Sequence, residues 1–322
     1  MRSPAPLSVT HSDPLLRDFE LPIRRTYHPY GFQVELSSNS ADVHHAAAEA
    51  WSMYRAVYSD PPITFRIAVQ PGDELSPQPV HRGQAHLYTI VGSQQNYACV
   101  DFEARFGYAW ITRATAADHS WLRWFYLDAM TGCMLAQRHH VPIHAACVAR
   151  RGAGVLLFGP SGMGKSTLSY ACARAGWTFI SDDCTSFPQN HDTCEVTGRP
   201  HQARFREDAP RLFPEFDGYV PRARPTGKVS IEVPMDTLAG IETAQHCEVD
   251  FLVFLERGES GGLSRLADED AMERMLANSG SYGPATFARH ERAMRRLLRA
   301  PAYRLRYTDL EEALDALEGL TA

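Results

Sequence analysis

The sequence contains almost no lysine. Only two of its 32 basic residues are lysines, Lys165 and Lys228, and arginine supplies the rest. The net charge of −6 at pH 7 lacks the basic excess typical of proteins that bind nucleic acid by electrostatics, so we predict no nucleic-acid partner. No apolar run approaches the roughly 18 residues of a membrane helix. The N-terminus lacks the apolar core of a secretory signal. We therefore expect a cytoplasmic protein with no membrane partner.

The sequence also lacks the patterns of a disulfide or zinc framework. Its seven cysteines are scattered, odd in number and free of any Cys-x-x-Cys pair, which favours reduced thiols. His139, His140 and His144 lie close together in the sequence, but no carboxylate or cysteine pattern accompanies them, so we predict no zinc site. The composition, 44% hydrophobic and 22% charged, is that of an ordinary globular protein.

The chain is long enough for two domains with cores of their own. We expect a loose N-terminal arm at residues 1–20, an α+β domain of unknown role at 21–138 and an α/β domain at 139–322. Hydrophobic periodicity and turn residues predict helices at 41–56, 118–136, 165–175, 268–277 and 287–299. The same signals predict strands at 63–69, 86–91, 97–111, 143–149, 154–158, 177–181 and 249–255. A capping box over 308–311 predicts a last helix.

One run of residues carries a specific chemistry. It reads Gly159-Pro160-Ser161-Gly162-Met163-Gly164-Lys165-Ser166-Thr167 and is a P-loop, or Walker A, motif. Its glycines let backbone N–H groups turn inward around a phosphate, Lys165 places a compact charge against the outer phosphates, and the Ser166 hydroxyl ligates Mg²⁺. A lysine suits this position better than the planar fork of arginine. The motif therefore predicts ATP and Mg²⁺ as cofactors.

Two aspartates follow the P-loop motif at short range. Asp182 and Asp183 come 17 and 18 residues after Lys165, at the end of the predicted strand 177–181. A strand that returns directly after the P-loop helix would bring both carboxylates next to Ser166. One carboxylate can then hold Mg²⁺ while the other accepts the proton of an attacking hydroxyl. The alternative interpretation is an Asp-Asp turn that merely ends the strand.

Residues 140–190 resemble the catalytic domain of HPr kinase/phosphorylase and the HprK-related kinases, whose nucleotide-binding fold is similar to that of phosphoenolpyruvate carboxykinase. The resemblance rests on Ile143-His144-Ala145-Ala146, the strand at 154–158, the P-loop motif and the Asp pair. It implies a kinase that transfers the γ-phosphate of ATP to a serine-type hydroxyl, and it is compatible with a homo-oligomer. The family's histidine falls on His144, and its proton-accepting aspartate falls in the Asp pair, where we assign it to Asp183.

Other candidates are less closely defined. Lys228, the second lysine, is a candidate cation for the transferring phosphoryl group, with a solvated surface lysine as the alternative. A further metal carboxylate is expected between 190 and 210, where Glu195, Glu207 and Asp208 compete and Glu207 is our choice. The arginines of the helix at 287–299 could dock an acidic peptide or a second subunit, or simply form a solvated face.

The sequence thus predicts an ATP- and Mg²⁺-dependent kinase acting on a hydroxyl of a protein, a peptide or a small molecule. The Arg-Gly-Leu-Gly-type signature of HPr kinases is not visible after the Asp pair, and residues 1–135 match no regulatory domain of that family, so the acceptor stays open. Two alternatives also stay open: a nucleotide-sensing module with little chemistry, and a carboxykinase-like enzyme that acts on a small acid. The intact Asp pair argues against the first, because a sensor needs no base.

Overall fold

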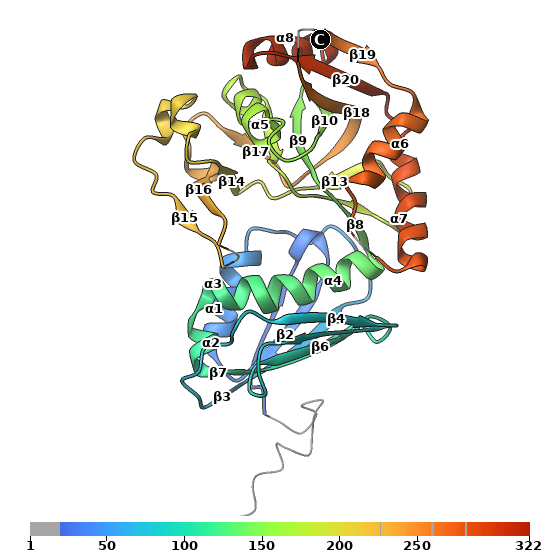
Figure 1. Cartoon of the computed structure of the whole chain (residues 1–322). Helices are drawn as coiled ribbons and strands as arrows, with labels where there is room; N and C mark the ends of the chain where they lie inside the picture. The colour runs from blue at the N-terminus through green and yellow to red at the C-terminus, as the bar shows by residue number, and fades with distance from the viewer. Residues whose placement is uncertain (1–19, 226, 259–260, 281) are drawn as a thin grey trace, which may run out of the picture. The chain divides into compact units, whose positions relative to one another are not determined.

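Figure 1 shows the computed structural model of the chain, which describes residues 20–225, 227–258, 261–280 and 282–322. Of the arm predicted at 1–20, all but Glu20 lies outside the described residues. The chain is a mixed α/β protein with several sheets and divides into two compact units, Met1–Arg138 and His139–Ala322. Within the described part of the chain, no helix combines the length and the apolar character that crossing a bilayer requires.

The first unit is a seven-stranded sheet packed against helices. The strand order is β1-β2-β3-β7-β6-β5-β4, and apolar side chains from one face of the sheet share a core with the helices. The strands are β1 (Ile23–Tyr27), β2 (Val34–Ser38), β3 (Ile63–Gln70), β4 (Val80–Gln84), β5 (Leu87–Val91), β6 (Tyr97–Asp101) and β7 (Phe106–Thr112). The helices are α1 (Ala41–Trp51), α2 (Arg113–Ala117), α3 (His119–Leu122) and α4 (Asp128–Arg138), with a π-helical turn at Arg123–Leu127 between the last two.

Two predictions for this unit were wrong in detail. The strand predicted at 97–111 is a hairpin of β6 and β7, because the Asp101 side chain accepts the backbone N–H groups of Glu103 and Ala104, both at 2.9 Å, and reverses the chain. Such side-chain turns need neither glycine nor proline, so the strand pattern hides them. The helix predicted at 41–56 ends at Trp51.

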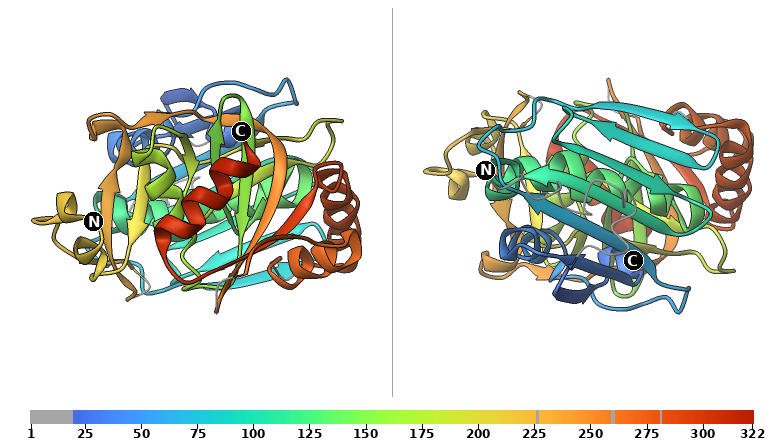
Figure 2. Two further views of the ribbon diagram at one scale, coloured as in Figure 1. Left: turned by 90° about the horizontal axis from the view of Figure 1, so that it is seen from above. Right: turned by 90° about the horizontal axis from the view of Figure 1, so that it is seen from below.

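The main sheet of the second unit is buried on both faces. Its order is β17-β11-β9-β10-β18, with β20 paired to β18 and β19 paired to β20. Helices α5 and α8 cover one face and helices α6 and α7 cover the other, and Figure 2 (left) shows α8 lying across the strands. Burial on both faces explains continuous apolar runs such as the one at 154–158. The strands are β9 (Ala145–Arg150), β10 (Ala153–Phe158), β11 (Thr178–Ser181), β17 (Glu242–Thr243), β18 (His246–Arg257), β19 (Gly262–Arg265) and β20 (Ala302–Tyr307).

The helices of this unit agree with the sequence prediction within a few residues. They are α5 (Lys165–Arg174), α6 (Asp268–Ala277), α7 (Pro284–Leu297) and α8 (Leu310–Leu320). The cap of α8 differs by one residue from the predicted box. Asp309 accepts the N–H of Glu312 at 2.9 Å, and the Glu312 carboxylate accepts the N–H of Thr308 at 3.0 Å.

Strand direction brings three distant segments to one edge of the main sheet. β9 runs antiparallel to both of its neighbours, β10 and β11. The start of β9 therefore lies beside the ends of β10 and β11. His144 precedes β9, the loop at 159–167 follows β10, and Asp182 with Asp183 follows β11. All three segments predicted to carry chemistry meet at this edge.

The strand predicted at 143–149 is broken at His144. The part before it, β8 (His140–Ile143), pairs with β12 (Thr185–Pro188), whereas β9 pairs with β10 and β11. β12 pairs in turn with β13 (Glu195–Thr197), which lies beside β18. His144 thus occupies the point at which the chain changes its sheet partners, and its backbone leaves the regular ladder there.

A small sheet adds a wall next to α5. It contains β14 (Gln202–Phe205), β16 (Val229–Pro234) and β15 (Arg222–Ala223), in that order. Phe205 and the short helical turns at Ala209–Arg211 and Pro214–Phe216 pack around Tyr170 of α5 in an aromatic cluster. This packing fixes the small sheet against α5, the helix that begins within the P-loop motif. Local patterns in the sequence did not predict β14 or β15.

Candidate functional site

A cleft of about 410 Å³ opens where the three segments meet. The 159–167 loop, the start of β9, the Asp pair and the small sheet all contribute to its lining. Its acidic residues are Asp182, Asp183 and Asp208, and its cationic residues are Lys165, Arg199, Arg204, Arg206, Arg224, Lys228 and Arg257. A larger hollow, about 740 Å³, lies on the first unit around Arg24 and Arg66. None of the predicted site residues lines it, so its size does not make it the site of the motif chemistry.

The backbone of the 159–167 loop requires glycine at two positions. Gly162 and Gly164 have φ of +93° and +100°, which L side chains rarely adopt. A Cβ on Gly164 would lie 2.6 Å from Tyr307 Oη, and one on Gly162 would lie 3.0 Å from Arg206 Nη2. The Tyr307 hydroxyl donates to the carbonyl of Met163. β20 therefore holds the loop from one side, and α5 begins directly behind it with the free N–H groups of a helix N-terminus.

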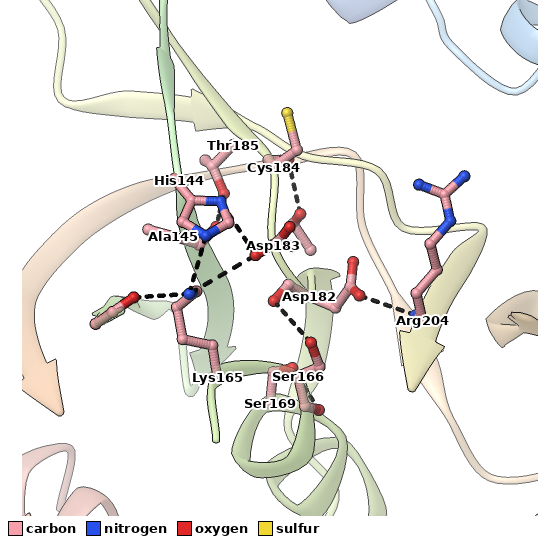
Figure 3. A network of polar contacts seen from close by, with 12 residues as sticks. His144, Ala145, Lys165, Ser166, Ser169, Asp182, Asp183, Cys184, Thr185 and Arg204 are labelled. Atoms are coloured by element: carbon pink, nitrogen blue, oxygen red, sulfur yellow. Dashed lines mark hydrogen bonds and ion pairs between the residues drawn. The ribbon is translucent and has the colours of Figure 1, made fainter. Parts of the chain in front are cut away.

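Lys165, His144 and Asp183 form a closed polar triangle (Figure 3). Lys165 Nζ donates to the Gly159 carbonyl at 2.7 Å and lies 3.2 Å from His144 Nε2 and 3.7 Å from Asp183 Oδ1. His144 Nδ1 lies 3.2 Å from the same Asp183 oxygen. An ammonium group can only donate, so His144 accepts at Nε2. This contact assigns the ring proton to Nδ1, the nitrogen that faces Asp183 Oδ1.

The charge states agree with this assignment. Burial lowers the pKa of His144, and Lys165 and Lys228 lower it further, while Asp183 raises it. The ring is therefore neutral at pH 7. Burial also lowers the pKa of Lys165, whose side chain is only 5% exposed, and Asp183 offsets part of that effect.

The two aspartates have different surroundings. Asp182 is 7% exposed, and its Oδ2 accepts the backbone N–H of Arg204 at 2.9 Å. Burial raises the pKa of Asp182 to about 6, although the Arg204 N–H lowers it. The Asp183 side chain is 50% exposed and faces His144 and Lys165. One carboxylate is thus held inside the wall of the cleft, while the other is open to it.

Short contacts hold the Asp pair beside the loop and β9. The Ser166 hydroxyl lies 3.5 Å from the carbonyl of Asp182. Ser181 Oγ donates to the carbonyl of Cys184 at 2.7 Å, which closes a turn around the pair. Thr185 Oγ1 donates to the carbonyl of Ala145 at 2.8 Å and ties the segment after the pair to the residue after His144 (Figure 3).

Most of the predicted site residues line the cleft. These are His144, Ser161, Gly162, Gly164, Lys165, Ser166, Thr167, Asp182, Asp183 and Lys228. Gly159 contributes its carbonyl to Lys165. Pro160 is exposed, and Met163 packs against the core beneath the loop, so neither side chain faces the cleft.

The predicted third metal carboxylate does not reach the cleft. Glu207 is exposed and does not line it, whereas its neighbour Asp208 does. Glu195 lies 3.4 Å from His246 in an ion pair. Adjacent side chains in a loop point in different directions, so spacing alone could not choose between residues 207 and 208. Among the described residues, no group of three or more His, Cys, Asp or Glu side chains is placed to hold a metal ion.

The arginines of the cleft were not among the residues predicted from the sequence. A signal was available for two of them, because Arg204 and Arg206 alternate with buried Ala203 and Phe205 along β14 and its extension. Arg224 lies four residues before Lys228, in a stretch that contains several proline and arginine residues. Arg199 and Arg257 reach the cleft from separate segments, so no local pattern marks them.

No family model and no curated protein matches the sequence. Among solved structures, the chain is similar to the Hpr(Ser) kinase/phosphatase from Coxiella burnetii, with 16% sequence identity and a TM-score of 0.29. The match covers 56% of this chain and 97% of that one. A TM-score of this size is a weak likeness.

Proposed function

We propose that the second unit is an ATP- and Mg²⁺-dependent kinase that transfers the γ-phosphate to a serine-type hydroxyl of a protein, peptide or small molecule. The observation that carries this proposal is the convergence of Asp183, His144 and Lys165 in one cleft beside the P-loop motif. The sequence resemblance to HPr kinase-like enzymes supports the same reaction.

The residues of the cleft fit a magnesium-bound nucleotide. Gly162, Gly164 and the start of α5 offer backbone N–H groups to phosphate, and Lys165 supplies a point charge. The Ser166 hydroxyl and the Asp182 carboxylate are oxygen donors of the kind that Mg²⁺ prefers, and Mg²⁺ at such sites takes its other ligands from phosphates and water. When bound, Mg·ATP supplies the phosphoryl group and the metal charge that stabilises its oxygens.

Asp183 is the residue placed to accept a proton. Its half-exposed carboxylate lies 3.2 Å from His144 Nδ1 and 3.7 Å from the Lys165 ammonium. A hydroxyl that hydrogen-bonds to this carboxylate would lose its proton there as its oxygen attacks phosphorus. A positioned base of this kind contributes roughly 10²- to 10⁴-fold in rate. The remaining rate comes from positioning and from the cations of the cleft.

The test follows label from γ-phosphate-labelled ATP into a size-fractionated cell extract in the presence of Mg²⁺. Asp183→Asn should bind ATP as the wild type does but transfer no label. Glu207→Gln, an exposed carboxylate outside the cleft, is the matched control and should transfer label like the wild type. Label that appears only as free phosphate, or equally with Asp183→Asn, would contradict the kinase and favour a sensing module. Transfer that requires an added carboxylic acid would indicate the carboxykinase-like alternative.

A further inference from the structure

The cleft holds more positive charge than a nucleotide needs. Seven cationic side chains and three carboxylates line it, whereas a magnesium-bound triphosphate carries only about two negative charges. Several arginines elsewhere in this unit do form ion pairs, among them Arg150–Glu318, Arg274–Glu256 and Arg299–Asp192. Arg206, Arg224 and Lys228 have no carboxylate at ion-pair distance within the part of the chain that the structure describes.

Two of the cleft arginines, Arg206 and Arg257, lie beside the glycines of the P-loop motif. A Cβ added to Gly162 would lie 3.0 Å from Arg206 Nη2. A Cβ added to Gly164 would lie 3.2 Å from Arg257 Nη2. Arg257 also stacks on the ring of Tyr307, 4.2 Å from its centroid. These two guanidinium groups border the loop, where phosphates would bind.

Arg224 stands on a different wall. It follows β15 in the hairpin with β16, where its N–H donates to the carbonyl of Lys228 at 3.0 Å. Its Nε donates to the hydroxyl of Ser230 at 3.3 Å, and Ser230 is 3% exposed. With Nε held in this way, the terminal nitrogens Nη1 and Nη2 present the fork that binds a carboxylate or a phosphate bidentately.

This wall borders the Asp pair. β14 bonds to Asp182 through the N–H of Arg204, and β16 joins β14 to β15. Burial lowers the pKa of Arg224 and Arg204 lowers it further, while Glu232, Asp182 and Asp183 raise it. Arg224 is thus within electrostatic reach of the proposed base, on the wall formed by the small sheet.

We propose that Arg224 binds an acidic group of the phosphoryl acceptor, a carboxylate or a phosphate that lies a few atoms from the reacting hydroxyl. This inference rests on the proposed kinase function. The acceptor oxygen bonds to the γ-phosphorus as the bond to the β-phosphate oxygen breaks, its proton passes to Asp183, and ADP leaves. Arg224 would offset the repulsion that an acidic acceptor meets from Asp182, Asp183 and the triphosphate. A neutral acceptor would leave a half-buried guanidinium without its anion, so the subsite selects acidic acceptors.

The binding test uses three probes with similar three-carbon backbones: glycerol, glycerate and glycerol 3-phosphate. Their binding to the full chain is measured by calorimetry with Mg²⁺ and a non-hydrolysable ATP analogue present. We expect the two acids to bind at millimolar concentration and glycerol not to bind. Arg224→Gln should weaken the acids tenfold or more, and Arg224→Lys should restore part of the affinity. Arg222→Gln, an exposed arginine of the same hairpin outside the cleft, should change nothing. The stronger acid identifies the anion as carboxylate or phosphate.

Three results would overturn the proposed subsite. Glycerol and the acids could bind equally well, neither acid could bind, or Arg224→Gln could weaken binding of the ATP analogue and not binding of the acids. Transfer of labelled phosphate separates this inference from the function on which it rests. If the acids bind through Arg224 but the protein transfers label to no acceptor at all, the kinase function is refuted and the anion-binding site at Arg224 remains supported. Label that enters neutral and acidic acceptors equally would keep the kinase and refute the subsite.

Discussion

His144 Nδ1 lies 3.2 Å from Asp183 Oδ1, although 39 residues separate the two in the sequence. The contact exists because His144 stands just before β9 and Asp183 just after β11, and these two strands are antiparallel neighbours. The same histidine accepts from Lys165 through its other nitrogen. In the proposed kinase His144 would be a positioning residue, because it contacts both the proposed base and the lysine of the P-loop motif.

Substitution of His144 should separate these two contacts. His144→Ala should lower kcat roughly 10- to 100-fold, with nucleotide affinity changed only a few-fold, because the base loses its orienting donor. His144→Asn should recover part of the rate, since its amide N–H can take the place of Nδ1–H. His144→Gln reaches toward the Nε2 position instead and should recover less. Steady-state kinetics and nucleotide titration of the three variants test this. Rescue by glutamine alone would assign the role to the Lys165 contact.

Gly164 should be irreplaceable for a reason that is steric as well as conformational. Gly164→Ala combines φ of +100° with a Cβ 2.6 Å from Tyr307 Oη, so it should abolish nucleotide binding and destabilise the fold by about 1–3 kcal/mol. Gly218 is the matched control, because its φ is +96° but a Cβ there meets nothing within 4 Å. Gly218→Ala should cost about 1 kcal/mol and leave nucleotide binding intact. Urea unfolding and nucleotide titration measure both effects, and equal nucleotide affinity in the two variants would contradict the steric account.

Acid should destabilise the fold through His140. Burial, together with the neighbouring His139 and His290, lowers the pKa of His140 to about 3. Because the folded pKa lies below the ordinary value, the stabilising contribution is complete above about pH 6.5 and is lost as the pH falls toward 3.

Between pH 7 and pH 5, protonation of the unfolded chain at His140 should cost about 2 kcal/mol of unfolding free energy. Urea unfolding of the wild type and of His140→Phe across this range isolates the effect, because only the difference between their pH slopes is read. Identical slopes in the wild type and His140→Phe would refute the assignment.

Local patterns in the sequence identified the elements whose signals are local. The glycines, lysine and serine of the P-loop motif lie within nine residues, and α5 begins within the motif and buries Leu168 and Cys172. The last helix was placed within one residue of its cap. A short chain segment can hold such information because its backbone geometry depends on the residues within it.

The tertiary structure decided the remainder. The strand order β11-β9-β10 places His144 against Asp183, and the change of sheet partners at His144 breaks a strand that looked continuous. The same folding brings Arg224 into the cleft and selects Asp208 over Glu207 as a lining residue. These outcomes depend on which strands pair and which way each loop turns. Pairing joins residues far apart in the chain, and no local run of residues records it.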